Sequence, residues 1–258
     1  MSARRADAAA EDSGGSSQSL RAQLALREMI VGGELPAGER IAELAMVDRL
    51  AMSRTPIRTA LVRLQEEGLL EPLPGGGYVV REFSEGDIQD AIELRGTLEG
   101  LAARLAAERG ANASVLAEMR ECLGEIDTLL AAPKISAAAF AAYARHNLRF
   151  HALLAEASGS AVVQRQIERA VTLPFASPNG FVMVDSAGAG GRDRLMLAHE
   201  QHHAIVEAIV LREGTRAEAL AREHARHARR NLADVMADRR QWRQVPGVTL
   251  IRRRAGTR

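Results

Sequence analysis

AMSRTPIRTAL, at residues 51–61, is the stretch on which the fold of this chain depends. It predicts a helix, because Thr55 is a good N-cap and Pro56 suits the first helical turn, where the amide that proline lacks would be unpaired. Apolar side chains then recur at helical spacing and would face a core, at Ile57, Ala60, Leu61 and Leu64.

Two arginines mark the N-terminal end of this predicted helix. Arg54 and Arg58 are four residues apart and therefore share a face. A helix that reads DNA touches base edges from its N-terminal end. The planar guanidinium can bond guanine O6 and N7 together, or it can clamp a phosphate. Taken alone, the stretch is equally compatible with an ordinary amphipathic helix that carries solvated arginines.

The flanking sequence favours the DNA-reading alternative. It predicts a helix over 24–30, a turn at 35–39, a short helix over 41–50, and strands over 69–73 and 78–81 around a glycine-rich turn. Three helices followed by a glycine-tipped hairpin form a winged helix-turn-helix. The glycines allow a tight turn and a close approach of the backbone to phosphates.

Residues 20–82 resemble the N-terminal domain of GntR-type transcription regulators. The similarity rests on GELPAG at 33–38, SRTPIR at 53–58, EGL at 67–69 and the glycine-rich wing. The resemblance implies a set of residues that contact operator DNA, namely Arg49, Ser53, Arg54, Thr55, Arg58, Gly76 and Gly77.

Length and composition predict a soluble protein of two domains. The chain has 258 residues, of which 47% are apolar and 26% charged. Its one cysteine, Cys122, excludes an intramolecular disulfide and fits a reducing cytoplasm. No apolar run approaches the roughly 20 residues that cross a bilayer. Residues 1–17 lack the apolar centre of a signal peptide, and we expect them to be disordered.

Of the sequence features, the net charge gives the weakest support to a DNA-binding function. The whole chain carries +1, and residues 20–82 hold eight arginines against nine carboxylates, whereas DNA-binding domains are usually more basic. The prediction therefore depends on where the arginines lie. From Arg239 onward the chain has seven arginines and no acid, which favours a solvated, frayed end over an auxiliary phosphate contact.

We predict a mainly α fold. A disordered tail (1–17) precedes a winged helix-turn-helix of three helices and a two-stranded wing (18–82), a linker (83–86), an all-α bundle of six to seven helices (87–237) and a basic tail (238–258). The bundle helices are expected near 85–109, 113–131, 136–157, 160–172, 192–212 and 215–237, with a long loop at about 174–191.

All seven histidines lie between residues 146 and 227. Imidazoles on the inward faces of three helices can converge on one metal ion. The candidates are His151, which shares a helix face with Asn147, and His202 and His224, which lie on apolar stripes. Periodicity does not decide this, because His199 and His203 form an equally regular stripe. Spacing alone favours buried, hydrogen-bonded structural histidines over a metal site.

Residues 86–235 resemble the all-helical ligand-binding domain of the FadR subfamily, often called FCD. The matching stretches are ELR at 93–95 with Glu99, NLRFH at 147–151, HHAIVEAI at 202–209 and EH at 223–224. In many members an aspartate and three histidines at such positions hold a divalent metal beneath an effector pocket. The resemblance implies a metal ion of the zinc, nickel or manganese class, with the ligands Asn147, His151, His202 and His224.

Asn147 departs from the family pattern, which usually has aspartate there. A neutral amide oxygen is a poorer ligand and leaves the site one negative charge short. The resemblance also implies that Arg95, Asn147 and His202 contact the effector, with the Arg95 guanidinium clamping a carboxylate. The alternative for Arg95 is an ion pair with Glu99 on the helix surface.

These expectations describe a cytoplasmic, homodimeric transcription regulator, more often a repressor in such families, that binds an inverted-repeat operator and a small carboxylate effector. It is not expected to be an enzyme or to contact a membrane. The alternatives are a regulator of the same type without metal, a metalloenzyme and an architectural DNA-binding protein. No carboxylate stands out as the general base of an enzyme. The helical domain over 87–237 is larger than dimerisation alone requires.

Overall fold

The computed structural model describes residues 3–132, 135–173, 175–179 and 191–237, together with 242, 243, 245 and 247–252. The chain divides into two compact units. One comprises Met1–Glu85 with Pro246–Arg258, and the other is Gly86–Val245. In the described part of the chain, no helix combines the length and apolar character that a membrane span requires.

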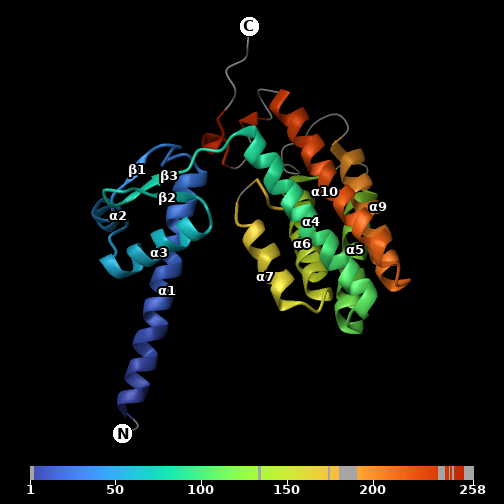
Figure 1. Cartoon of the computed structure of the whole chain (residues 1–258), viewed down its shortest axis with the longest axis horizontal. Helices are drawn as coiled ribbons and strands as arrows, with labels where there is room; N and C mark the ends of the chain where they lie inside the picture. The colour runs from blue at the N-terminus through green and yellow to red at the C-terminus, as the bar shows by residue number, and fades with distance from the viewer. Residues whose placement is uncertain are drawn as a thin grey trace. The chain divides into compact units, whose positions relative to one another are not determined.

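The first unit is the predicted winged helix-turn-helix (Figure 1). Its elements are α1 (Ala3–Val31), β1 (Arg40–Ile41), α2 (Glu43–Leu50), α3 (Arg54–Glu66), β2 (Leu70–Pro72) and β3 (Tyr78–Val80). Helix α1 packs against α3, and the fully buried side chains of Leu26, Ile57 and Leu61 lie in the core of this unit. The apolar stripe predicted for α3 thus faces inward.

Helix α3 is capped two residues earlier than predicted. Ser53, with φ −68° and ψ 165°, is the N-cap, and Thr55 lies inside the first turn, so the prediction of Thr55 as the cap was wrong. Pro56 stands at the third helical position. Proline is accommodated there because the first four or so amides of a helix have no intrahelical acceptor, so the missing N–H of Pro56 breaks no hydrogen bond.

The wing sheet has three strands rather than the two predicted. Its order is β1-β3-β2, and both pairings are antiparallel. Ile41, which we predicted to open a helix, pairs with Tyr78 of β3 and is 2% exposed. Burial against the wing therefore overrides the weak helical pattern at Ile41, and α2 begins at Glu43.

Helix α1 extends back to Ala3, so residues 3–17, for which the sequence predicts disorder, are helical in this structure. The segment contains no proline and is rich in alanine. Propagating a helix from a packed segment costs much less than nucleating one.

Part of the predicted basic tail belongs to the first unit instead of fraying. The 3-10 helix η1 (Val248–Leu250) contacts α1. The Phe83 amide donates to the Leu250 carbonyl oxygen at 2.8 Å, and the Arg252 amide donates to the Phe83 carbonyl oxygen at 2.8 Å. Phe83, Leu250 and Ile251 are buried. Phe83, which we placed in the linker, is thus anchored by the chain's own C-terminal segment.

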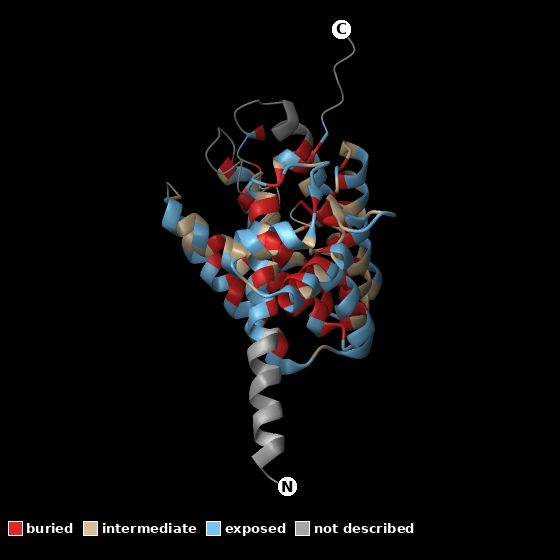
Figure 2. Cartoon of the chain, turned by 90° about the vertical axis from the view of Figure 1, so that its left-hand side faces the viewer, coloured by how far each residue is buried: buried red, intermediate tan, exposed pale blue. Residues whose placement is uncertain are grey.

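The second unit is a bundle of α-helices (Figure 1). Its described helices are α4 (Glu85–Arg109), α5 (Ala113–Ala131), α6 (Ala137–Ala157), α7 (Ala161–Ala170), α9 (Gly191–Val210) and α10 (Gly214–Ala237). They agree closely with the six predicted helices. Buried side chains such as Phe150, Leu153 and Ile209 form one core cluster. Figure 2 marks the buried residues along the helices in red. Of the loop predicted at 174–191, residues 174, 180 and 181–190 lie outside the described residues.

Two glycines bring α4 and α10 into close contact. A Cβ atom on Gly96 would lie 2.5 Å from Cβ of Ala225, and one on Gly100 would lie 2.7 Å from Cγ of Arg222. A side chain at either position would force the helices apart. This close packing sets Arg95 and Glu99 of α4 beside the helix that carries His224.

Candidate functional site

Helix α3 presents one polar face and one apolar face. Ser53, Arg54, Thr55 and Arg58 are exposed, whereas Pro56, Ile57, Ala60 and Leu61 are buried. The 3.6-residue period of the helix therefore separates the residues predicted to contact DNA from those that pack in the core. The N-terminal end of α3 is an exposed surface that carries Arg54 and Arg58.

The predicted DNA-contacting arginines differ in their partners. Arg49 forms an exposed ion pair with Glu34, at 2.8 Å. Within the described residues, no carboxylate lies within 4.0 Å of the guanidinium of Arg54 or Arg58. No acidic side chain in the described part of the chain therefore neutralises the charges of these two arginines.

The wing tip requires glycine at one position for two reasons. Gly77 has φ +78°, and a Cβ atom there would lie 2.9 Å from the Ile41 carbonyl oxygen. Gly76 has φ +91°, is exposed, and would have open space around a Cβ atom. Both glycines adopt a backbone conformation that other residues rarely enter.

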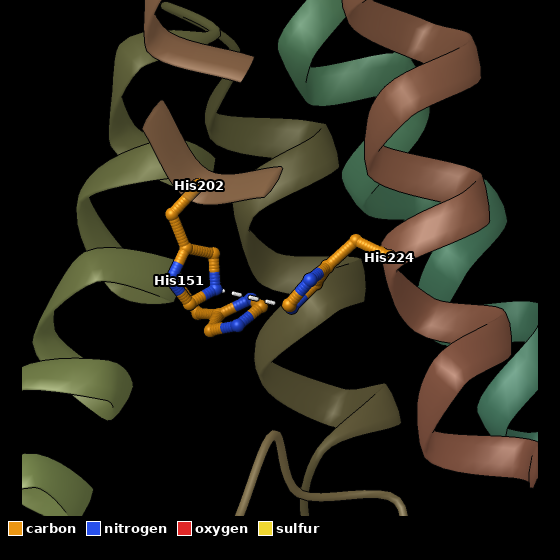
Figure 3. Close-up of side chains that lie close together, drawn as sticks. All are labelled: His151, His202 and His224. Atoms are coloured by element: carbon orange, nitrogen blue, oxygen red, sulfur yellow. Dashed lines mark hydrogen bonds between the residues drawn. The ribbon is translucent and has the colours of Figure 1, made fainter. Parts of the chain in front are cut away.

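In the second unit, three of the predicted ligands converge. His151 of α6, His202 of α9 and His224 of α10 form a cluster, called here the histidine centre, whose candidate ligand atoms lie within 4.8 Å of one another. Nε2 of His202 and Nε2 of His224 are 3.1 Å apart, and Figure 3 shows the three rings turned toward a common point. Residues far apart in sequence are thus brought together from three helices.

Glu99 of α4 holds one member of the histidine centre. Its Oε1 atom lies 2.9 Å from Nδ1 of His151, so Nδ1–H of the ring donates to the carboxylate and Nε2 faces away from it. That Nε2 atom is buried and has no hydrogen-bond partner among the described residues. An imidazole nitrogen aimed at two other imidazoles is a donor of the type that binds zinc and related metals.

Arg95 pairs with Glu99, but inside the bundle. Its guanidinium lies 3.4 Å from both carboxylate oxygens, and the two side chains are 2% and 1% exposed. The surface ion pair that we weighed as an alternative is thus a buried one. Sequence reasoning gave Glu99 no site role, because an Arg and a Glu four residues apart are usually a solvated pair.

Burial controls the protonation of this region. It lowers the pKa of His202 and His224 well below 6.5, and the neighbouring imidazoles lower both further, so both rings are neutral at pH 7. For Glu99, burial raises the pKa, but Arg95 and His151 outweigh it and bring the pKa to about 2. The centre thus combines neutral nitrogen donors with an ionised carboxylate behind one of them.

Asn147 and Arg95 line a small cavity next to the histidine centre. Its volume is about 40 Å³, and His224 and Tyr143 also contribute to its wall. The Asn147 amide nitrogen donates to Oδ1 of Asn179 at 2.8 Å, so this side chain is held by another asparagine. His202, 0% exposed, does not line the cavity. The predicted ligand role of Asn147 stays a prediction.

Two family models match the chain. The model described as bacterial regulatory proteins of the gntR family matches residues 18–80. The FCD domain model matches residues 90–227, which contain the whole histidine centre.

Curated relatives are named as regulators. One is an uncharacterized HTH-type transcriptional regulator of Agrobacterium vitis, in the TAR-I ttuE-ttuC' intergenic region, which is 39% identical over 99 residues. The match covers 38% of this chain and 58% of that relative, which is less than two thirds of the relative's length. The HTH-type transcriptional repressor GlaR of Escherichia coli is 26% identical over 202 residues, covering 77% and 88%. The solved structure of E. coli McbR/YncC shares the fold, with a TM-score of 0.58 at 20% identity over 85% of this chain and 97% of that chain.

We predict that Glu99→Gln destabilises the metal-free protein by about 3–5 kcal/mol, because it leaves Arg95 buried without a counter-charge. Urea unfolding in the presence of EDTA measures the loss. Glu93→Gln is the matched control, since Glu93 lies on the same helix but makes exposed pairs with Arg222 and Arg226, which are worth at most about 1 kcal/mol. Equal costs for the two variants would contradict the assignment.

The cost of Glu99→Gln should also depend on pH. Because the folded pKa of Glu99 is lowered from 4.5 to about 2, its ionised form stabilises the fold fully above pH 4.5. This contribution is lost as the pH falls toward 2. The difference in stability between the wild type and the variant should therefore narrow between pH 5 and pH 3.

Proposed function

Since the chain belongs to the gntR family of bacterial regulatory proteins with an FCD domain, we propose that it is a cytoplasmic transcriptional repressor whose affinity for operator DNA is controlled by a small carboxylate metabolite. The observation that carries the DNA-binding role is the exposed N-terminal end of α3, where Arg54 and Arg58 have no acidic partner among the described residues. The relatives' names as regulators support the same role.

The proposed DNA-bound form is a homodimer. Two winged units would bind the half-sites of an inverted repeat, so that the symmetry of the operator matches that of the protein. In each unit α3 would enter the major groove, and the wing at Gly76 and Gly77 would approach the adjacent backbone.

Arg58→Ala should reduce operator affinity by about 10- to 100-fold, because one bidentate arginine–guanine contact is worth about 1–3 kcal/mol. Electrophoretic mobility shift or fluorescence anisotropy on operator and scrambled DNA measures both affinity and specificity. Arg165→Ala is the control, because it removes the same charge from an exposed position on α7. Unchanged operator affinity in Arg58→Ala would refute the assignment of α3 as the DNA-reading helix.

We further propose that the histidine centre holds one divalent metal ion of the zinc, nickel or manganese class. Three imidazoles on three helices and the Glu99 carboxylate that orients His151 support it. Asn147 is the proposed fourth ligand, and its amide would have to turn its oxygen toward the ion. A bound cation would also separate the Nε2 atoms of His202 and His224, which otherwise share one proton.

Elemental analysis of the untagged protein, after gel filtration with a mild chelator, should give about one retained metal ion per chain. His202→Ala should lose it, because the centre then keeps two imidazoles. His146→Ala is the control, since His146 belongs to neither candidate metal cluster. If neither the wild type nor the control retains metal, the histidines are structural, and the regulator acts without metal.

The proposed effector contact is Arg95. Its guanidinium lines the cavity, and its bonds to Glu99 are long, at 3.4 Å, so a ligand carboxylate could replace them with shorter ones. A volume of about 40 Å³ has room for no more than a few water molecules. An effector must therefore select a more open state of the bundle, which couples its binding to a conformational equilibrium.

Small mono-, di- and tricarboxylates screened by thermal shift should include one that raises the unfolding temperature and weakens operator binding at least tenfold. Arg95→Lys should keep the charge beside Glu99 but lose most of this response, since an ammonium cannot form the bidentate contact. A full response in Arg95→Lys would show that the effector carboxylate is bound by another residue. Operator affinity that no acid in the panel changes would contradict carboxylate control.

A further inference from the structure

A second cluster of candidate ligands lies on the surface of the helical unit. Asp127 of α5 approaches His199 and His203 of α9, and their candidate ligand atoms lie within 4.8 Å of one another. Oδ1 of Asp127 is 2.8 Å from Nε2 of His199 and 3.2 Å from Nε2 of His203. The two Nε2 atoms are themselves 3.2 Å apart. We call these three residues the surface site.

These distances are close to those of a tetrahedral metal site. Zinc bonds to histidine nitrogen and carboxylate oxygen are about 2.0–2.2 Å long, which places neighbouring ligand atoms roughly 3.3–3.6 Å apart. The two edges that include His203 are 3.2 Å and only slightly shorter, whereas the edge between Asp127 and His199, at 2.8 Å, would lengthen by about 0.5 Å around an ion. Two histidines four residues apart project from the same face of a helix, and here both present Nε2 to one carboxylate oxygen.

A metal ion would resolve an electrostatic conflict within the cluster. If both Nε2 atoms carry protons for Asp127, two N–H dipoles of the same sense converge on one carboxylate oxygen, with their nitrogens only 3.2 Å apart. If one of them lacks its proton, that ring loses its bond to the carboxylate. One divalent cation can bind all three lone pairs at once, which neither protonation pattern achieves.

The surface site is open to solvent, unlike the histidine centre. The side chains of Asp127 and His203 are 55% and 47% exposed, whereas His199 is 6% exposed. Hollows of about 380 and 250 Å³ lie beside Asp127 and His203. Water or a ligand oxygen can therefore reach the remaining coordination position, and an ion can exchange with solution.

We propose that Asp127, His199 and His203 form a second, exchangeable site for a zinc-class divalent cation. The ion would link α5 to α9. Because α9 also carries His202, occupation of the surface site would stabilise the helix that supplies one ligand of the histidine centre. Imidazole with one carboxylate is the donor set that zinc and its neighbours prefer over magnesium or calcium.

Zinc titration of the full, untagged chain tests this proposal. Equilibrium dialysis with elemental analysis should show two zinc ions per chain in the wild type, one retained through a mild chelator wash and one exchangeable. Asp127→Asn and His203→Ala should weaken the exchangeable site at least tenfold and leave the retained ion. Both substitutions are at exposed side chains, so neither removes core packing. His146→Ala, the control, should keep both ions.

The two metal proposals fail separately. If the only zinc bound is lost in His202→Ala and unaffected by His203→Ala, the surface site is overturned and the histidine centre stands. If zinc binding is lost in His203→Ala but unaffected by His202→Ala, the surface site stands and the histidine centre fails. As a second readout, zinc should raise the unfolding temperature of His202→Ala, and this shift should disappear when His203→Ala is added.

Discussion

The helical unit depends on how it accommodates a buried arginine. Arg95 is 2% exposed, and burial of a guanidinium is tolerable only beside a counter-charge. Glu99 supplies that charge, and its Oε1 atom also accepts a hydrogen bond from Nδ1 of His151. One carboxylate therefore pairs with a cation of its own helix and fixes the orientation of an imidazole on α6. The glycine contacts between α4 and α10 bring His224 to the same place.

The two faces of α9 carry different chemistry. His202 points into the bundle and is 0% exposed, whereas its neighbour His203 is 47% exposed beside Asp127. A helix of 3.6 residues per turn places consecutive residues about 100° apart. Adjacent histidines thus serve a buried cluster and a surface cluster without competing for one point in space. In the sequence, the stripe of His199 and His203 is as regular as the one that carries His202. The structure separates them, because His199 and His203 face Asp127 and His202 faces the bundle interior.

Local sequence signals predicted most helices and strands correctly, whereas contacts between distant residues determine the segments that differ from the prediction. Ser and Asn caps and glycine stops are local, so the six bundle helices agree with prediction. The pairing of Ile41 with Tyr78 and the return of Leu250 to Phe83 depend on partners far along the chain, which periodicity does not reveal. The convergence of His151, His202 and His224 followed from family resemblance. Glu99 and Asp127 were missed as site residues because an isolated carboxylate on a helix is usually solvated.

The anchoring of Phe83 by residues 250–252 changes what counts as a separable domain. The chain leaves the first unit after Glu85 and returns to it after Val245, so the helical unit is an insertion, covalently attached at both of its ends. A fragment cut at the apparent linker would lack Leu250 and Ile251 and would uncover Phe83. The winged unit is therefore discontinuous in sequence, and a gene fusion that keeps Phe83 covered must retain residues 247–252 as well as the segment that ends at Glu85.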